Sequence, residues 1–118
     1  LESILADPVF ARVNFDISWD EVAKYVVASP EATRRTADLI NRYPDRFLFG
    51  TDTVAPKSAE AYYAPYEMYR PLWNQLTAEA REGILKRNYE RIFDEGRRNA
   101  RAWERAHPAG TGAPRAGR

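Results

Sequence analysis

The sequence contains no cysteine and a single histidine, His107. Without cysteine, the chain can form no disulfide, no thiolate metal site and no thiol nucleophile. A catalytic zinc ion takes about three protein ligands, usually including histidine. His107 lies in a stretch of Pro, Gly, Ala and Arg, where we expect a solvated side chain rather than a ligand. The chain therefore cannot build a histidine or cysteine zinc site by itself.

A dominant charge and a long apolar run are also missing. The 18 Lys and Arg residues nearly balance the 17 Asp and Glu residues, and the net charge of +1 gives no general attraction to nucleic acid or to an anionic membrane. No apolar run approaches the roughly 20 residues of a membrane span, and residues 1–5 show no signal-peptide pattern. The absence of cysteine suits a reducing compartment, and we take the cytoplasm as the default location. The composition is compatible with a small-molecule substrate and with a homo-oligomer.

The 118 residues fit one domain with a modest core. The sequence lacks an initiator Met, and Ile4 and Leu5 already resemble the end of an apolar helix stripe. We therefore expect residues 1–106 to be a fragment of a larger domain. Residues 107–118 offer little to bury, which predicts a disordered tail.

Apolar and polar residues alternate over residues 12–17, which predicts a short strand with one buried face. Ser18 and Glu21 then match the pattern of a capping box, in which the two residues bond each other's backbone amides. We therefore expect a helix to begin at Asp20.

A second helix should begin at Pro30, capped by Ser29, and end before Pro44. The apolar run at residues 47–49, closed by Gly50, is typical of a strand buried on both faces. The two predicted strands are separated by about 30 residues of helix, the length of a βαβ crossover. This spacing predicts a parallel pair.

The stretch after residue 53 is rich in Pro and Tyr and predicts a loop with one short helix over residues 66–76. Thr77 should cap the last helix, whose apolar residues share one face. These residues are Ala80, Ile84, Leu85, Tyr89, Ile92 and Phe93. The pattern fades past Gly96 into the Arg-rich run of residues 97–105, which we interpret as a solvated helix face rather than a phosphate site.

In parallel α/β folds, functional groups gather where the strands end at their carboxyl side. Asp52 follows the second predicted strand and could ligate a metal ion or take a proton from a metal-bound water. It could instead close a turn by accepting a hydrogen bond from the amide of Thr53 or Val54. Position alone leaves both roles open. Asp16 and Asp20 flank the end of the first strand, and we interpret both as structural.

Aromatic side chains are concentrated near the predicted strand ends. Trp19 follows the first strand, and tyrosines lie at positions 62, 63, 66 and 69. Such residues can line a pocket, but they more often pack against the next helix, which is the interpretation we favour here.

Three segments form a combined pattern. They are Tyr43 to Asp52, with Pro-Asp-Arg, an apolar run and Gly-Thr-Asp; Leu76 to Ala80; and Ile84 to Phe93, with Asn-Tyr-x-Arg-x-Phe. Together they resemble the C-terminal end of the amidohydrolase-related proteins, metal-dependent (β/α)8 TIM barrels of the amidohydrolase superfamily. The resemblance extends from about Leu1 to Phe93.

The resemblance implies an α/β fold in which residues 13–17 and 47–49 are the seventh and eighth strands of an incomplete barrel. Residues 1–106 would be its C-terminal portion. Asp52 would end the eighth strand and bind the divalent metal, zinc, or serve as general base. The family's first-strand His-x-His pair is absent, and two strands cannot close a barrel. We therefore expect the chain alone to lack hydrolase activity and to bind zinc weakly or not at all.

Three functions follow as hypotheses. The leading one is a fragment of a metal-dependent hydrolase acting on carbon–nitrogen or ester-like bonds. An alternative within the same family is a lyase, a non-oxidative decarboxylase of small aromatic or unsaturated acids. An alternative of another class is a small helical interaction module, with residues 84–93 as its partner-binding face.

Overall fold

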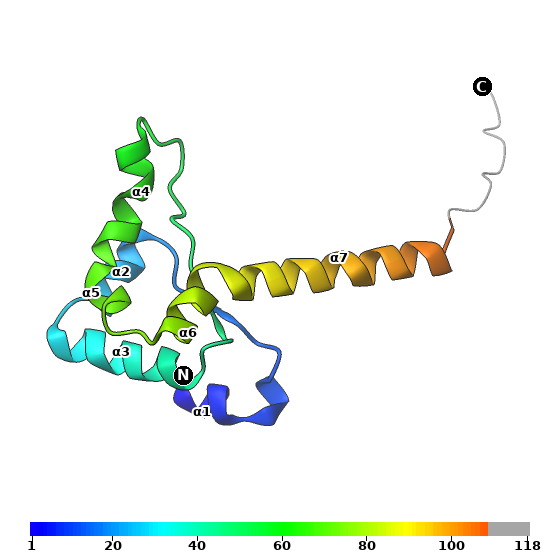
Figure 1. Ribbon diagram of the computed structural model, residues 1–118, viewed down its shortest axis with the longest axis horizontal. Coiled ribbons are helices and arrows are strands. Elements are labelled where there is room, and N and C mark those ends of the chain that lie inside the picture. Colours follow the sequence, from blue (N-terminus) through cyan, green and yellow to red (C-terminus); the bar gives the residue numbers. More distant parts are fainter. Residues whose placement is uncertain (109–118) are drawn as a thin grey trace, which may run out of the picture.

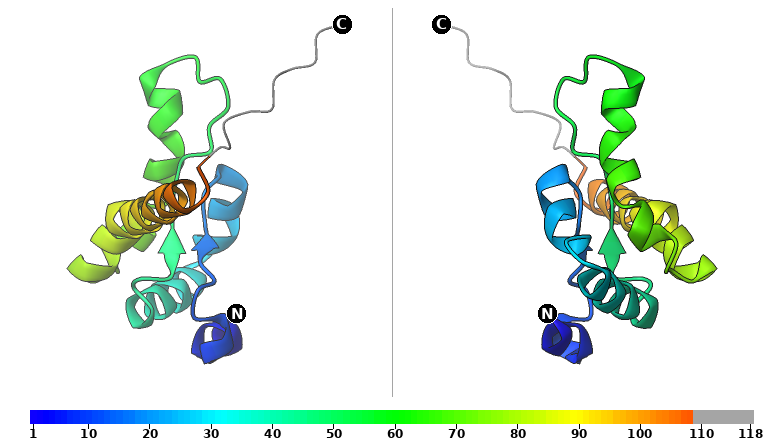
Figure 2. Two further views of the ribbon diagram at one scale, coloured as in Figure 1. Left: turned by 90° about the vertical axis from the view of Figure 1, so that its right-hand side faces the viewer. Right: turned by 90° about the vertical axis from the view of Figure 1, so that its left-hand side faces the viewer.

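A two-stranded parallel sheet lies at the centre of the fold. The computed structural model describes residues 1–108, in which β1 (Phe15–Asp16) pairs in parallel with β2 (Phe47–Leu48), with Phe15 opposite Phe47. Figure 2 shows the strands side by side and pointing the same way. The predicted parallel pair is confirmed, and the chain is a mixed α/β fold in which helices predominate.

Both strands are shorter than predicted. The alternating run at residues 12–17 becomes a strand only at Phe15, because Val13 belongs to a turn and its amide donates to the carbonyl of Phe10 (2.9 Å). Before this turn lie α1 (Glu2–Ala6) and the short 3-10 helix η1 (Pro8–Phe10). Alternation in the sequence therefore marks the strand but not its length.

The crossover between the strands consists of α2 (Asp20–Val26) and α3 (Pro30–Arg42). The predicted start of α3 is confirmed, since the Ser29 hydroxyl accepts a hydrogen bond from the amide of Ala32 (3.1 Å). Helix α3 packs beside α5 and α6 at the amino end of the strands, so the helices bury one another as well as the sheet (Figure 1).

The predicted capping box at the start of α2 is wrong. The residue that precedes α2 is Trp19, and no side chain caps the helix there. Ser18 instead accepts a hydrogen bond from the amide of Gly50 (2.5 Å), and Glu21 pairs with Lys24 on the helix surface. The contact with the neighbouring strand end therefore replaces the local cap that the sequence pattern favours.

The predicted loop after β2 is also largely wrong, because most of it is helical. It contains α4 (Ala59–Met68) and α5 (Arg70–Trp73). The Ser58 hydroxyl starts α4 by accepting from the amide of Ala61 (3.2 Å), and Pro65 lies within that helix. Pro65 removes one backbone hydrogen bond from α4, but the residue is buried against the rest of the fold.

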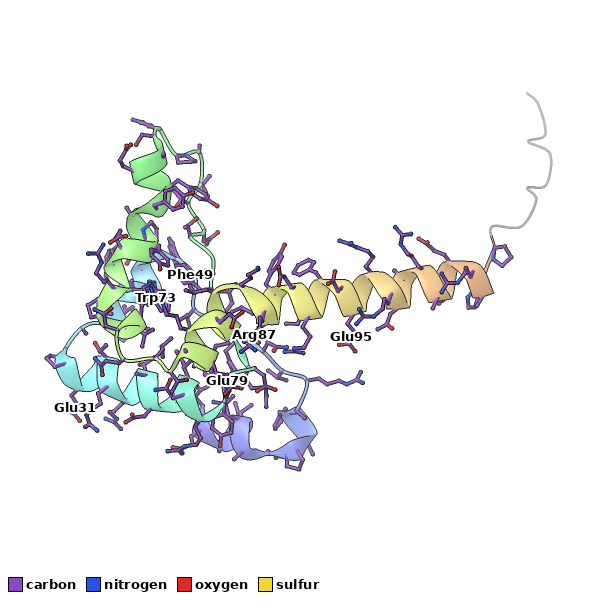
Figure 3. The ribbon with its side chains drawn as sticks, viewed as in Figure 1. Glu31, Phe49, Trp73, Glu79, Arg87 and Glu95 are labelled. Atoms are coloured by element: carbon purple, nitrogen blue, oxygen red, sulfur yellow. The ribbon has the colours of Figure 1, made fainter. Side chains whose placement is uncertain are left out.

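The core lies between the sheet, α3, α5 and the last helices. Its largest fully buried side chains are Trp73, Tyr69, Phe47, Ile40, Leu72 and Ile84. Phe49 packs edge-on against Tyr69 and Trp73, with ring centroids 5.1 Å and 5.0 Å apart (Figure 3). The packing interpretation is thus confirmed for Tyr69, whereas Tyr62 and Tyr63 are exposed.

The last three elements follow one another without an intervening loop. Helix α6 (Ala78–Glu82) begins at Thr77, whose hydroxyl accepts from the amide of Ala80 (3.1 Å) as predicted. It passes through a π-helical segment, η2 (Gly83–Arg87), into α7 (Asn88–Ala106). Figure 1 shows α7 projecting from the body of the molecule.

The predicted apolar face of the last helix is only partly buried. Ala80 and Ile84 lie in the core, whereas Tyr89 and Phe93 are about half exposed, at 55% and 54%. The helix also continues past Gly96 to Ala106, although the apolar pattern fades there. Of the predicted tail, His107 ends α7 with its amide bonded to the carbonyl of Trp103 (2.9 Å), and residues 109–118 lie outside the described residues.

Arg46 anchors the amino end of β2 to the segment before β1. It is 7% exposed, and its guanidinium donates to the carbonyls of Val13 (2.8 Å), Phe10 (2.5 Å) and Leu5 (3.5 Å). The last two carbonyls lie at the C-terminal ends of short helices, where partial negative charge favours a cation. Arg46 thereby ties the start of β2 to the segment that leads into β1.

Asn88 and Gly83 anchor the same end of β2 to the last helix. The Asn88 amide group donates to the carbonyls of Pro44 and Phe47, both at 2.8 Å. Gly83 allows this close approach, because a Cβ atom there would lie 2.6 Å from the Pro44 carbonyl oxygen. Arg91 adds a bond to the carbonyl of Asp45 (2.8 Å). The residues that carried the family resemblance here act on the backbone of β2.

Candidate functional site

The carboxyl ends of β1 and β2 open into a shared hollow. Asp16, Ser18, Trp19, Gly50 and Asp52 line it, and its volume is about 380 Å³. Because the strands are parallel, the residues that follow each strand leave the sheet at the same end. We call this space the strand-end hollow.

Ser18 connects the two strand ends. Its amide donates to the Asp16 carboxylate (2.8 Å) and its hydroxyl donates to the same carboxylate, while the hydroxyl oxygen accepts from the Gly50 amide (2.5 Å). A Cβ atom at Gly50 would lie 3.3 Å from the Ser18 hydroxyl, which leaves little room for a larger residue. The Asp16 carboxylate therefore accepts hydrogen bonds from Ser18, in agreement with a structural role.

Asp52 lies in the strand-end hollow with its carboxylate unengaged. Its backbone has a φ of 50°, in the left-handed region that Asp tolerates better than most residues. The residue is exposed, and among residues 1–108 no amide of Thr53 or Val54 donates to its carboxylate. The turn-closing hydrogen bond that we considered for Asp52 is thus not formed.

Trp19 and Asp52 also line a second hollow. The second hollow has a volume of about 310 Å³ and is mainly apolar, with Val54, Pro65 and Met68 among its lining residues, together with Trp19, Asp20 and Asp52. Trp19 has φ 88° and ψ 142°, a conformation that side-chain-bearing residues rarely adopt. An indole 49% exposed and a free carboxylate therefore face the same region.

The Tyr69 hydroxyl contacts the backbone that follows β1. Tyr69 is fully buried, and its hydroxyl donates to the carbonyl of Ile17 and lies 3.3 Å from that of Trp19. Burial, with the negative charges of Asp16 and Asp20 adding to it, raises the pKa of Tyr69 well above its usual value. Tyr69 thus keeps its proton and positions the strand end, a role that the sequence did not assign to any one of the four tyrosines in residues 62–69.

The carboxylates present do not make a metal site by themselves. Within residues 1–108, no group of three or more His, Cys, Asp or Glu side chains is arranged to hold a metal ion. Asp52 can supply one ligand at most, and His107 lies at the far end of α7, exposed and stacked on Trp103 with ring centroids 4.6 Å apart. The described residues therefore do not fit a complete zinc site.

The remaining candidate groups lie away from this edge. The Arg-rich run at residues 97–105 lies on the exposed surface of α7, consistent with a solvated helix face. Its only acidic contact among the described residues joins Arg97 to Asp94 at 4.0 Å. Within residues 1–108, every helix is too short or too polar to cross a lipid bilayer.

Comparisons of the chain with protein-family models, with curated proteins and with solved structures find no match. The site has to be interpreted from its own geometry.

Proposed function

We propose that this chain provides the last two strands of a larger metal-dependent barrel hydrolase of the amidohydrolase-related type. In this proposal Asp52 is a metal ligand or the general base. The observation that carries it is a free, exposed carboxylate at the carboxyl edge of a parallel strand pair, where α/β enzymes hold their reacting groups.

Asp52 is preferred over the neighbouring carboxylates because of what they already bind. The Asp16 carboxylate accepts two hydrogen bonds from Ser18. Asp20 lies in the first turn of α2, where an acidic residue is favoured by the helix dipole. Asp52 has neither constraint, so it can accept a proton from water or coordinate a cation without breaking a native contact.

The unpaired edges of the sheet support the proposal that the chain belongs to a larger protein. Within the described residues each strand has one hydrogen-bonded neighbour, so each leaves one edge unpaired. Parallel sheets are normally covered on both faces and continued by further βα units. Each strand in this chain is followed by helices, an order compatible with two successive βα units of such a barrel.

A metal ion would supply a polarised water in the proposed reaction. Because the described carboxylates do not complete its coordination, the other ligands would come from outside residues 1–108. In this proposal the described residues contribute the Asp52 carboxylate and the neighbouring apolar hollow to the active site. The strand end that carries them is bonded by Tyr69.

The test begins with the coding DNA upstream of the Leu1 codon. The proposal expects an open reading frame that continues upstream and encodes further strands with a His-x-His pair. In the extended protein, purified with zinc and assayed on amide and ester substrates, Asp52→Asn should lower kcat/KM by about 10²- to 10⁴-fold. Asp94→Asn, an exposed acid on α7, is the matched control and should leave it unchanged.

Three results would contradict the proposal. One is a stop codon followed by a start codon close to Leu1. Another is full activity of the Asp52→Asn protein, with circular dichroism showing that both variants are folded. The third is release of CO₂ from aromatic or unsaturated acids in place of hydrolysis, which would assign the site to a decarboxylase.

A further inference from the structure

Helix α7 carries an apolar stripe along its projecting part. The stripe consists of Tyr89, Phe93, Gly96, Ala100 and Trp103, which follow one another at spacings of four, three, four and three residues. This alternation keeps side chains on one face and is the spacing by which two helices pack along a common seam. We refer to these five residues as the α7 stripe.

The α7 stripe is uncovered within the described part of the chain. Its aromatic residues Tyr89, Phe93 and Trp103 are 55%, 54% and 63% exposed. At its middle is a mainly apolar hollow of about 490 Å³, lined by α7 residues alone, and a Cβ atom at Gly96 would meet no other atom within 4 Å. Gly96 thus leaves a gap between Phe93 and Ala100 that a side chain from another helix can fill.

The charges of α7 are divided between its two halves. The first half, residues 88–96, holds three acidic residues and one basic residue, whereas the second half, residues 97–106, holds four basic residues and one acidic residue. Glu90 and Arg97 lie near the α7 stripe, and their present contacts are long, 3.9 Å to Lys86 and 4.0 Å to Asp94. Such exposed pairs contribute little and leave both residues free to form other ion pairs.

We propose that the α7 stripe binds the α7 stripe of a second copy of this chain in an antiparallel arrangement. Phe93 of each copy then fills the gap at Gly96 of the other. Glu90 of each copy comes alongside Arg97 of the other, because these two residues lie at similar distances on opposite sides of the crossing point.

Charge decides the direction of the pairing. In an antiparallel pair the acidic half of each helix meets the basic half of the other, and each contact is made twice by symmetry. A parallel pair would place like halves together, with Phe93 against Phe93 and an unfilled gap at Gly96. The association concerns α7 alone and goes beyond the proposed function, since it does not involve Asp52.

The expected interface is small. The α7 stripe covers about two heptads of one helix. Two such stripes should bury less surface than the roughly 1,200 Å² at which stable interfaces begin, so the dimer should dissociate on dilution. Sedimentation equilibrium over about a hundredfold range of concentration should show the mass of the intact chain rising from 13.6 kDa toward twice that value.

The apolar part of the contact is tested with Phe93→Ser. Removing the ring that fills the gap should weaken self-association by about tenfold or more. The matched control is Tyr25→Ser, which removes an aromatic side chain that is 78% exposed on α2. It should leave self-association unchanged.

The charge pairing gives a test specific to two copies of the same helix. Glu90→Arg and Arg97→Glu should each weaken self-association by about tenfold, because each creates like-charge contacts in a symmetric dimer. Mixing the two variants should restore association, since both cross-pairs then join opposite charges. Arg35→Glu, on the exposed surface of α3, should have no effect.

Some outcomes would overturn the proposal. A chain that stays monomeric at the highest concentration has no such interface. Self-association that survives Phe93→Ser arises elsewhere, for example at the sheet edges. If the Glu90→Arg and Arg97→Glu proteins fail to associate when mixed, although each is folded by circular dichroism, the antiparallel arrangement is wrong.

Discussion

The two ends of β2 differ in how their backbone is satisfied. At the amino end, Arg46 bonds carbonyl groups of the segment before β1, Asn88 of α7 bonds the carbonyls of Pro44 and Phe47, and Gly83 allows η2 to come close. At the carboxyl end, Asp52 has a positive φ and a free carboxylate, beside Trp19 in a rare backbone conformation. Buried side chains that bond distant segments lie at the amino end of the strand, and the exposed carboxylate lies at the other end.

The largest effect is expected from breaking the amino end at Arg46. Arg46→Met keeps much of the apolar stem but leaves the carbonyls of Val13 and Phe10 without their donor. Removing charged hydrogen bonds from a buried site should lower the free energy of unfolding by about 3 kcal/mol. Urea unfolding measures it, with Arg34→Met on the exposed face of α3 as control. A loss no greater than that of the control would show that the anchor is unimportant.

The sequence predicted those parts of the fold that depend on neighbouring residues. Ser29 and Thr77 start their helices as expected, because a cap acts over three residues. Ser18 did not, because its hydroxyl bonds Gly50, 32 residues away. The roles of Arg46 and Asn88 likewise depend on contacts 33 to 44 residues apart, which no local pattern encodes.

The candidate site was predicted to a similar extent. Asp52 was identified from its position after an apolar run, and the structure places it at the carboxyl edge of the sheet. The strained backbone of Trp19 and the supporting hydroxyl of Tyr69 were missed. The carbonyls near the Tyr69 hydroxyl lie 50 and 52 residues away in the sequence. Trp and Tyr at strand ends are ordinary residues when only the sequence is considered.

A second prediction compares two glycines of the last helical stretch, Gly83 in η2 and Gly96 in α7. Gly83→Ala places a methyl group 2.6 Å from the Pro44 carbonyl oxygen, which Asn88 holds in place, and should destabilise the fold by about 1–3 kcal/mol. Gly96→Ala meets nothing within 4 Å and should stabilise α7 by about 0.5–1 kcal/mol. Thermal unfolding in dilute solution, where the chain is monomeric, measures both. Equal effects would mean that the close approach at Gly83 is absent.

A third prediction concerns Tyr69, whose hydroxyl lies at the carboxyl end of β1. Tyr69→Phe removes a buried donor to the Ile17 carbonyl and should cost about 1 kcal/mol at neutral pH. The native pKa of Tyr69 is raised above 10.0, so above pH 10 the unfolded chain loses this proton while the native chain keeps it. The stability of the unmodified protein therefore falls with rising pH, and its advantage over Tyr69→Phe should narrow. A difference that is constant from neutral pH to pH 11 would contradict the raised pKa.

The smallest effect is expected at the carboxyl end of β2. Within residues 1–108 no group forms a hydrogen bond with the exposed Asp52 carboxylate, so Asp52→Asn should change the free energy of unfolding by less than about 0.5 kcal/mol. One exposed carboxylate without two further ligands should also bind zinc weakly, and calorimetry on the 118-residue chain should show no stoichiometric binding. Tight binding that Asp52→Asn abolishes would mean that this edge already holds a complete site. No zinc binding by the chain, together with an unchanged stability of Asp52→Asn, would agree with the contrast between the two ends of β2. The amino end would then stabilise the fold, and the carboxyl end would carry a carboxylate that the fold does not need.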